Sequence, residues 1–374
     1  MKIFKNSLLI IVGLLFFSCT EDKVISLEDN KFNKPIPQVP VNTDYTVGAI
    51  YTKFESKFDR ISNTVVETPF IGIYDGNSAD PIRYEEHVKQ AKKTAGVDFF
   101  IFSLRSANFV ADTTYIHDLQ KNHLENTPIP EQMKFAFSYT FNPQGSTNTS
   151  PFQESSTTED QFLKDFELMK DFFDEKKYPN YMRINNKVVV YMNNSYNLFA
   201  YDNTALYKKL RARMLADYKV ELYLIGMQLE WTPTLRFFTK GYNRFEGCVD
   251  ALTYTNYANI LLVDYDRQLF FHKYVNLAWS YHKETLAKYN IEFVPTISPS
   301  YNPKINNESS TNYVIAKNAD WFKANCNIAR KTSGANKLVI IDSFNNWNLN
   351  TQIESATSYG DEYLKILRSE FKVN

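Results

Sequence analysis

The chain has 374 residues, and its 42 Lys and Arg balance 42 Asp and Glu, so the formal charge is zero. A neutral chain without a basic cluster does not favour a nucleic-acid partner. No His, Cys and carboxylate residues have metal-ligand spacing, and no glycine-rich phosphate loop is present, so the sequence predicts neither a metal nor a cofactor. Cys248 and Cys326 are too few for a disulfide framework, and we expect both to be free. A single bridge between them is the alternative.

The N-terminus has the pattern of an export signal. Lys2 and Lys5 precede an apolar run, Ser7–Ser18, which is too short to span a bilayer comfortably. The run ends in Leu-Phe-Phe-Ser-Cys, which resembles a bacterial lipobox with cleavage before Cys19. We therefore expect residues 1–18 to be a signal peptide and Cys19 to carry a lipid that anchors the protein in the outer membrane. The alternative is an uncleaved apolar N-terminus with an unrelated cysteine.

A polar segment follows the lipidation site. Its first residues include the acidic pair Glu21-Asp22, which resembles a signal for display on the outer cell surface. Prolines at positions 35, 37 and 40 fix φ and remove backbone donors, so residues 19–43 are predicted to be a flexible tether. We expect the protein to be lipid-anchored and to face the cell exterior.

The rest of the chain alternates short β-branched or aromatic runs with amphipathic helical patterns, which predicts a parallel sheet with crossover helices. The first unit is a strand at Tyr45–Tyr51, then a helix with Asp80 as its N-cap and Pro81 at its first position. Gly96 ends this helix. The second strand, Val97–Phe102, is largely apolar, as expected for a strand buried on both faces.

The same pattern continues to the C-terminus. A capping box at Thr158–Gln161 predicts the start of a helix that buries Phe162 and Phe166, and the last helix covers about Asp361 to Phe371. Eight strands in this order predict a single (β/α)8 barrel over residues 44–374, with an open doubly wound sheet as the alternative. The six further strands are Lys134–Tyr139, Asn186–Tyr191, Val220–Met227, Val249–Tyr254, Glu292–Ile297 and Lys337–Ile341.

The C-terminal ends of the strands carry the chemistry in barrels of this kind. Here these ends are rich in tyrosine and amide side chains, among them Tyr139, Asn193, Tyr254 and Tyr301, and poor in histidine. Such groups donate and accept hydrogen bonds, which suits the hydroxyl groups of a neutral sugar. The sequence therefore favours a carbohydrate as the ligand.

The most specific motif is at the eighth strand, where residues 341–354 read Ile-Asp-Ser-Phe-Asn-Asn-Trp-Asn-Leu-Asn-Thr-Gln-Ile-Glu. This resembles the signature of glycoside hydrolase family 99, the endo-α-mannosidases and endo-α-mannanases, which typically reads Ser-Phe-Asn-Glu-Trp-His-Glu-Gly-Thr-Gln-Ile-Glu. Softer likenesses at 69–75 and 295–301 extend the resemblance from about residue 44 to the C-terminus. It implies a (β/α)8 barrel that handles α-mannosides. The agreeing positions are Ser343, Phe344, Asn345, Trp347, Thr351, Gln352, Ile353 and Glu354.

The departures from this signature concern its chemistry. By the resemblance, one family glutamate supports attack by the sugar's 2-hydroxyl and the other is the acid/base, and these positions hold Asn346 and Leu349 here. An amide has no proton to exchange at neutral pH, and an alkyl chain has nothing to donate. Because glycoside hydrolysis commonly requires two carboxylates, we expect the chain not to cleave by the family's route.

Three functions are compatible with these residues. The first is a barrel that binds an α-mannan-type or related glycan without hydrolysing it. The second is an active hydrolase with relocated carboxylates, for which Asp75 and Glu230 are the candidates. Asp342 and Asp250 are weaker choices because they lie in or near strands. The third is a non-catalytic scaffold that binds another surface protein.

Under the first two hypotheses, the partners are a carbohydrate, the membrane through the lipid, and possible neighbouring glycan-uptake proteins. For Trp347, packing of the barrel end is the alternative to a contact with the sugar. We expect the substrate-binding residues to be Tyr74, Asp75, Glu230, Trp231, Tyr301, Asn345, Asn346, Trp347 and Gln352.

Overall fold

The computed structural model describes residues 35–53, 67–76, 78–143, 146–147, 149–228, 244–254, 270–312 and 314–373. The chain divides into two compact units, Met1–Pro37 and Gln38–Asn374, and all the helices and strands described lie in the second. The predicted signal peptide, Cys19 and most of the tether lie outside the described residues. In the part of the chain that is described, no helix is long and apolar enough to cross a membrane.

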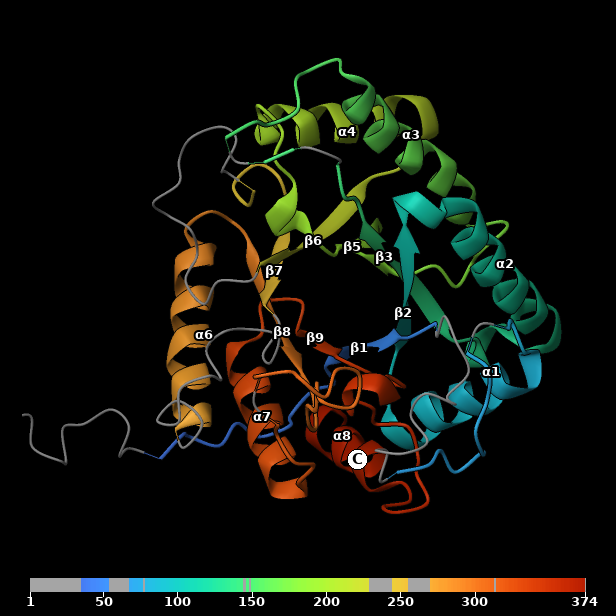
Figure 1. Cartoon of the computed structure of the whole chain (residues 1–374), viewed down its shortest axis with the longest axis vertical. Helices are drawn as coiled ribbons and strands as arrows, with labels where there is room; N and C mark the ends of the chain where they lie inside the picture. Colours follow the sequence, from blue (N-terminus) through green and yellow to red (C-terminus); the bar gives the residue numbers. More distant parts are fainter. Residues whose placement is uncertain are drawn as a thin grey trace, which may run out of the picture. The chain divides into compact units, whose positions relative to one another are not determined.

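Eight parallel strands form a closed barrel (Figure 1). Each strand pairs in parallel with its neighbour, and the pairing of β3 with β5, which aligns Phe137 with Val190, closes the ring. An open doubly wound sheet would leave two unpaired edges, so this pairing excludes it and confirms the predicted barrel. The strands are β1 (Thr46–Tyr51), β2 (Phe99–Arg105), β3 (Lys134–Thr140), β5 (Lys187–Met192), β6 (Leu222–Gln228), β7 (Ala251–Tyr254), β8 (Glu292–Ile297) and β9 (Leu338–Ile341).

Helices surround the barrel and cover the outer faces of its strands (Figure 1). Helix α1 continues directly into a π-helical segment, Lys89–Ala95, which Gly96 ends at a positive φ of 71°. The helices are α1 (Pro81–Val88), α2 (Phe109–Asn126), α3 (Thr157–Met169), α4 (Asn203–Tyr218), α6 (Phe271–Ala287), α7 (Ala319–Thr332) and α8 (Glu362–Phe371).

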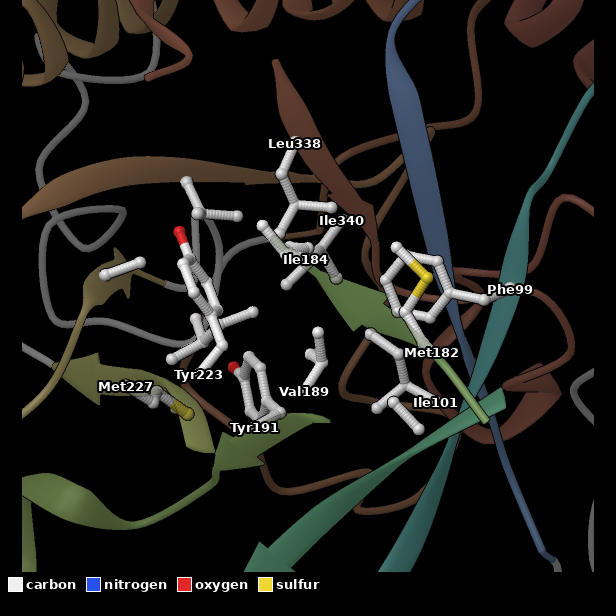
Figure 2. Close-up of a cluster of buried hydrophobic side chains, with 14 residues drawn as sticks. Phe99, Ile101, Met182, Ile184, Val189, Tyr191, Tyr223, Met227, Leu338 and Ile340 are labelled. Atoms are coloured by element: carbon white, nitrogen blue, oxygen red, sulfur yellow. The ribbon is translucent and has the colours of Figure 1, made fainter. Parts of the chain in front are cut away.

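A short antiparallel hairpin, which the sequence pattern did not predict, closes the N-terminal end of the barrel. Strand β4 (Arg183–Ile184) pairs with the first residues of β5 through a turn in which Asn185 and Asn186 have φ of 51° and 65°. Asparagine tolerates this left-handed conformation, so the two residues suit a tight hairpin. Met182 and Ile184 pack with side chains from β2, β5, β6 and β9 in the barrel interior (Figure 2).

The strands alternate inward and outward side chains, and this alternation decides which strand-end residues reach the interior. Tyr191 of β5 belongs to the interior cluster (Figure 2). Tyr139 and Tyr254, which the sequence placed among the strand-end polar groups, instead lie on the outer face. The Tyr139 hydroxyl donates to Asp165 of α3 at 2.7 Å, and the Tyr254 ring stacks on His282 of α6.

Two local predictions were tested at helix starts. Asp80 caps α1 as predicted, because its side chain accepts from the N–H groups of Ile82 and Arg83. The capping box of α3 was placed two residues too late: the cap is Ser156, whose hydroxyl accepts from the Glu159 N–H at 3.3 Å. Ser156 stands three residues before Glu159, which is the spacing that a capping box requires.

Cys248 and Cys326 are buried, and neither forms a disulfide bond among the described residues, as expected.

Candidate functional site

The residues that match the family signature follow β9, at the C-terminal end of the barrel, here called the barrel mouth. The main chain of this loop folds back on itself: the Ser343 N–H donates to the Thr351 carbonyl at 3.0 Å, and the two hydroxyls lie 3.1 Å apart. Ser343 Oγ also accepts from the Asn346 N–H at 2.7 Å. The loop is therefore held by its own matching residues.

Asn345 ties this loop to the end of β1. Its Oδ1 accepts from the Thr52 N–H at 2.7 Å, and its Nδ2 donates to the Thr52 carbonyl at 3.2 Å. The amide thus pairs with both main-chain groups of the residue that follows the strand, as a further strand partner would. Asn345 is buried, and its predicted contact with a sugar stays a prediction.

Glu354 is the centre of a buried polar network. Its carboxylate accepts from the Tyr74 hydroxyl at 2.7 Å and from Trp347 Nε1 at 2.9 Å. His87 Nε2 lies 3.0 Å from the other carboxylate oxygen, and His87 Nδ1 lies 2.9 Å from the Tyr51 hydroxyl. A neutral imidazole with its proton on Nε2 satisfies both contacts. Burial raises the pKa of the Tyr74 hydroxyl well above its usual value, and the nearby Glu354 charge adds to this.

This network decides the role of Trp347. The indole is only 1% exposed, and its N–H is used by Glu354, so it packs the barrel end rather than offering an open face to a ligand. The alternative that we gave for Trp347 is therefore the arrangement found.

Gln352 is buried on the outer side of the loop. Its Nε2 donates to Glu67 at 2.8 Å, and the Lys317 ammonium lies 3.2 Å from the same carboxylate. Lys317 also donates to the Gln352 carbonyl at 3.0 Å and lies over the Tyr359 ring at 4.6 Å. Burial lowers the pKa of Lys317 to about 8, although Glu67 opposes the shift.

Tyr301 and the segment around it support the motif loop from the neighbouring strand. Tyr301 is buried and forms an antiparallel bridge with Ile315. The Asn302 N–H donates to the Leu349 carbonyl at 2.7 Å, and the Ser300 hydroxyl donates to the Asn350 carbonyl. The likeness to the family at residues 295–301 thus corresponds to the end of β8 and the segment after it, which holds the motif loop.

Asp75 lies in the loop before α1. Arg83 donates to the main-chain carbonyls of Asp75 and Ser78, and its guanidinium lies over the Tyr74 ring at 4.9 Å. Asp75 and Arg83 line a groove of about 880 Å³ together with residues of α1 and the last turns of α2. The other predicted carboxylate, Glu230, and its neighbour Trp231 lie outside the described residues.

The two positions that lack the family's glutamates differ from the matching ones. Asn346 and Leu349 are half-buried, whereas the matching residues from Ser343 to Glu354 are buried. The Asn346 Oδ1 is itself buried and has no hydrogen-bond partner among the described residues. The loop therefore separates into buried residues that hold it and partly exposed residues that have changed.

Asp342 is one of the two weaker candidate carboxylates of the sequence analysis. It stands directly after β9, and burial raises the pKa of its carboxyl group from 3.8 to about 6. The four strand residues before it, Leu-Val-Ile-Ile, are all apolar, so their pattern could not reveal which face Asp342 occupies. The other weak candidate, Asp250, is used structurally, because it binds Arg211 and the Leu224 N–H.

The described residues contain no group of three His, Cys, Asp or Glu side chains that could hold a metal ion.

Comparison with known proteins relates the whole barrel to glycoside hydrolases. No protein-family model and no curated protein matches the chain. A solved structure of a glycoside hydrolase-like protein is 36% identical, and the match covers 93% of this chain and 99% of that one with a TM-score of 0.82. The chain belongs to the glycoside hydrolase-like proteins.

The expected likeness to family 99 is found in the fold. The family 99 endo-α-mannosidase from Bacteroides thetaiotaomicron, in complex with bis-tris-propane, matches with a TM-score of 0.61 and 15% identity, over 88% of this chain and 96% of that one. A second structure of that enzyme gives a TM-score of 0.60 at 13% identity, with the same coverage of both chains. At 13–15% identity, these two matches show that the fold is shared, and they show nothing more.

We predict that Trp347→Phe lowers the free energy of unfolding by about 1–3 kcal/mol, because the buried Glu354 carboxylate loses one of its donors. Denaturant unfolding followed by circular dichroism measures this. Tyr201→Phe, at a ring that is 56% exposed, is the control and should change stability little. Equal stability of Trp347→Phe and the wild type would contradict the structural role of the indole.

We predict that Asp342→Asn stabilises the protein at pH 8 by up to about 3 kcal/mol. The folded carboxyl group has the higher pKa, so the folded state binds its proton more tightly than the unfolded state. The wild type therefore loses stability as the pH rises from about 4 to about 6, whereas an amide does not titrate. Unfolding at pH 4 and pH 8 measures the difference. A gain of the same size at both pH values would show that ionisation of Asp342 is not its cause.

Proposed function

We propose that the chain is a surface lipoprotein that binds a neutral glycan of α-mannan type at the barrel mouth and does not hydrolyse it. The observation that carries this proposal is the division within the motif loop. The residues that match the family are buried and hold the loop, while the half-buried Asn346 and Leu349 replace the ionisable groups.

The chemistry of the replaced positions favours binding over cleavage. An amide such as Asn346 can accept and donate hydrogen bonds to a hydroxyl without a charge that must be desolvated. It cannot transfer a proton to a departing oxygen, and Leu349 can neither donate nor accept. Loss of each acid/base group reduces the rate by about 10²–10⁴, so the family's route is expected to be closed.

The alternative of a rewired hydrolase receives no support from Asp75. This residue lines the groove along α1 and α2, which neither Asn346 nor Leu349 lines. Retaining and inverting hydrolysis both need two carboxyl groups within about 5–10 Å of each other across the bond.

We predict that the purified mature protein binds yeast α-mannan and releases no reducing ends from it. Asn346→Ala should weaken binding about two- to tenfold, the value of one hydrogen bond. Asn126→Ala, in the groove along α1 and α2, is the matched control and should bind like the wild type. Calorimetry and a reducing-sugar assay measure the two quantities.

Other outcomes would favour the other hypotheses. Sustained release of reducing ends that disappears in Asp75→Ala or Glu230→Ala would support a hydrolase. Absence of binding to yeast α-mannan and across a broad glycan array would support a scaffold that binds another surface protein.

The proposed location follows from the N-terminal sequence, and it places the protein where glycan-uptake proteins could be its neighbours. We expect Cys19→Ala to abolish incorporation of a labelled fatty acid. We expect the double variant Glu21→Ala/Asp22→Ala to keep the lipid but to resist protease added to intact cells, which should digest the wild type. Equal digestion of the wild type and the double variant would argue against the acidic pair as a surface signal.

A further inference from the structure

Asp342 lies on the inner face of the barrel. Its N–H donates to the Ile297 carbonyl at 2.9 Å, so it continues the pairing of β9 with β8 by one residue. Leu338 and Ile340 of β9 point into the interior, as Figure 2 shows. Since side chains alternate along a strand, Asp342 takes the next inward position. Burial raises the pKa of the hydroxyl of Tyr191, a member of the interior cluster, and the Asp342 charge adds to this shift, which agrees with this position.

No hydrogen bond or ion pair reaches the Asp342 carboxyl group from the residues that the structure describes. Two other described carboxylates in this part of the fold are paired: Asp112 of α2 binds Arg105 and Lys53, and Asp98 binds Lys372. Burying a polar group without a partner costs free energy, so such a group in a native protein calls for an explanation. Asp342 is only half-buried, and it is therefore reachable from the barrel mouth.

A second polar group without a partner lies in the same loop. The Asn346 Oδ1 is buried and accepts no hydrogen bond within the described part of the chain. The bond from the Asn346 N–H to Ser343 Oγ keeps Asn346 beside the residue that follows Asp342. Both oxygen groups thus belong to the segment that follows β9, and neither has a partner among the described residues.

We propose that Asp342 and Asn346 form one subsite for a neutral sugar, in which the Asp342 carboxyl group donates to a sugar oxygen and the Asn346 amide oxygen accepts from a neighbouring hydroxyl. This rests on the proposed binding of a glycan at the barrel mouth and adds the residue that contacts it. A sugar suits the pair because each hydroxyl group can both donate and accept. Asp342 is then a ligand-binding residue at a position that the family signature does not include.

The surroundings of Asp342 favour its neutral form. On the neighbouring strands β1 and β8, the residues nearest to it are Ile50 and Ser298, which do not titrate. Among the described residues of the interior cluster, Tyr191 and Tyr223 are titratable, and the Asp342 charge acts on Tyr191. Lys53 and Arg105, at the ends of β1 and β2, both pair with Asp112 of α2. Burial raises the pKa of Asp342 to about 6, and a ligand that excludes water from the mouth would favour the proton further.

The test compares yeast α-mannan binding by the purified mature protein and its variants at pH 5 and pH 8. We expect the wild type to bind more tightly at pH 5, where Asp342 carries its proton. Asp342→Ala should weaken binding at least tenfold at pH 5. Asp342→Asn keeps a neutral donor, so its affinity should not depend on pH and should exceed that of the wild type at pH 8. Asp320→Asn, whose side chain is 93% exposed, is the matched control and should behave like the wild type.

The outcomes separate this subsite from the proposed function. If Asp342→Ala binds like the wild type at both pH values while Asn346→Ala binds less, the subsite is wrong and glycan binding at the mouth stands. If the wild type binds neither yeast α-mannan nor any neutral glycan, both are wrong. Tighter binding of a chitosan oligosaccharide than of neutral glycans at pH 8 would overturn the neutral subsite, because an ionised Asp342 would then be pairing with an amine. Thermal unfolding of each variant confirms that it is folded.

Discussion

The buried carboxylate of Glu354 is the interaction on which the barrel mouth depends. A carboxylate with no solvent exposure is tolerable only where donors surround it, and here Tyr74, Trp347 and His87 supply them. These donors come from the loop before α1, from the motif loop and from α1 itself. One charge therefore joins the first and last segments of the barrel, and removal of any donor would leave it partly unsatisfied.

This arrangement separates the support of the site from its chemistry. Glu354, Asn345 and Ser343 make contacts within the protein, so they hold the loop whatever residue stands at the two replaced positions. Asn346 and Leu349 could change without loss of the fold because neither side chain belongs to that support. The same separation explains why an unpaired carboxyl group can persist at Asp342, since a stable frame can carry one unfavourable group where a ligand is bound.

The frame of the barrel was confirmed, whereas the predicted ligand contacts stay predictions. The motif indicated Asn345, Trp347 and Gln352, and all three are buried and bonded to the protein, because a matching residue can serve packing as well as binding. Tyr139 and Tyr254 face helices, because a one-residue step along a strand reverses the side chain. The alternation also places Asp342 on the inner face, which the apolar strand before it could not indicate.

The sequence by itself determined the order of eight strands and their crossover helices, the cap of α1, and the absence of carboxylates at positions 346 and 349. These are local properties, set by periodicity, capping chemistry and residue identity. Only the tertiary structure decided that β3 pairs with β5 to close the ring, that Glu354 joins His87 across the chain, and that Asp342 faces the interior. The first two depend on which distant residues meet. The third depends on the direction of a side chain, and the sequence of an all-apolar strand does not indicate which of its residues face the interior.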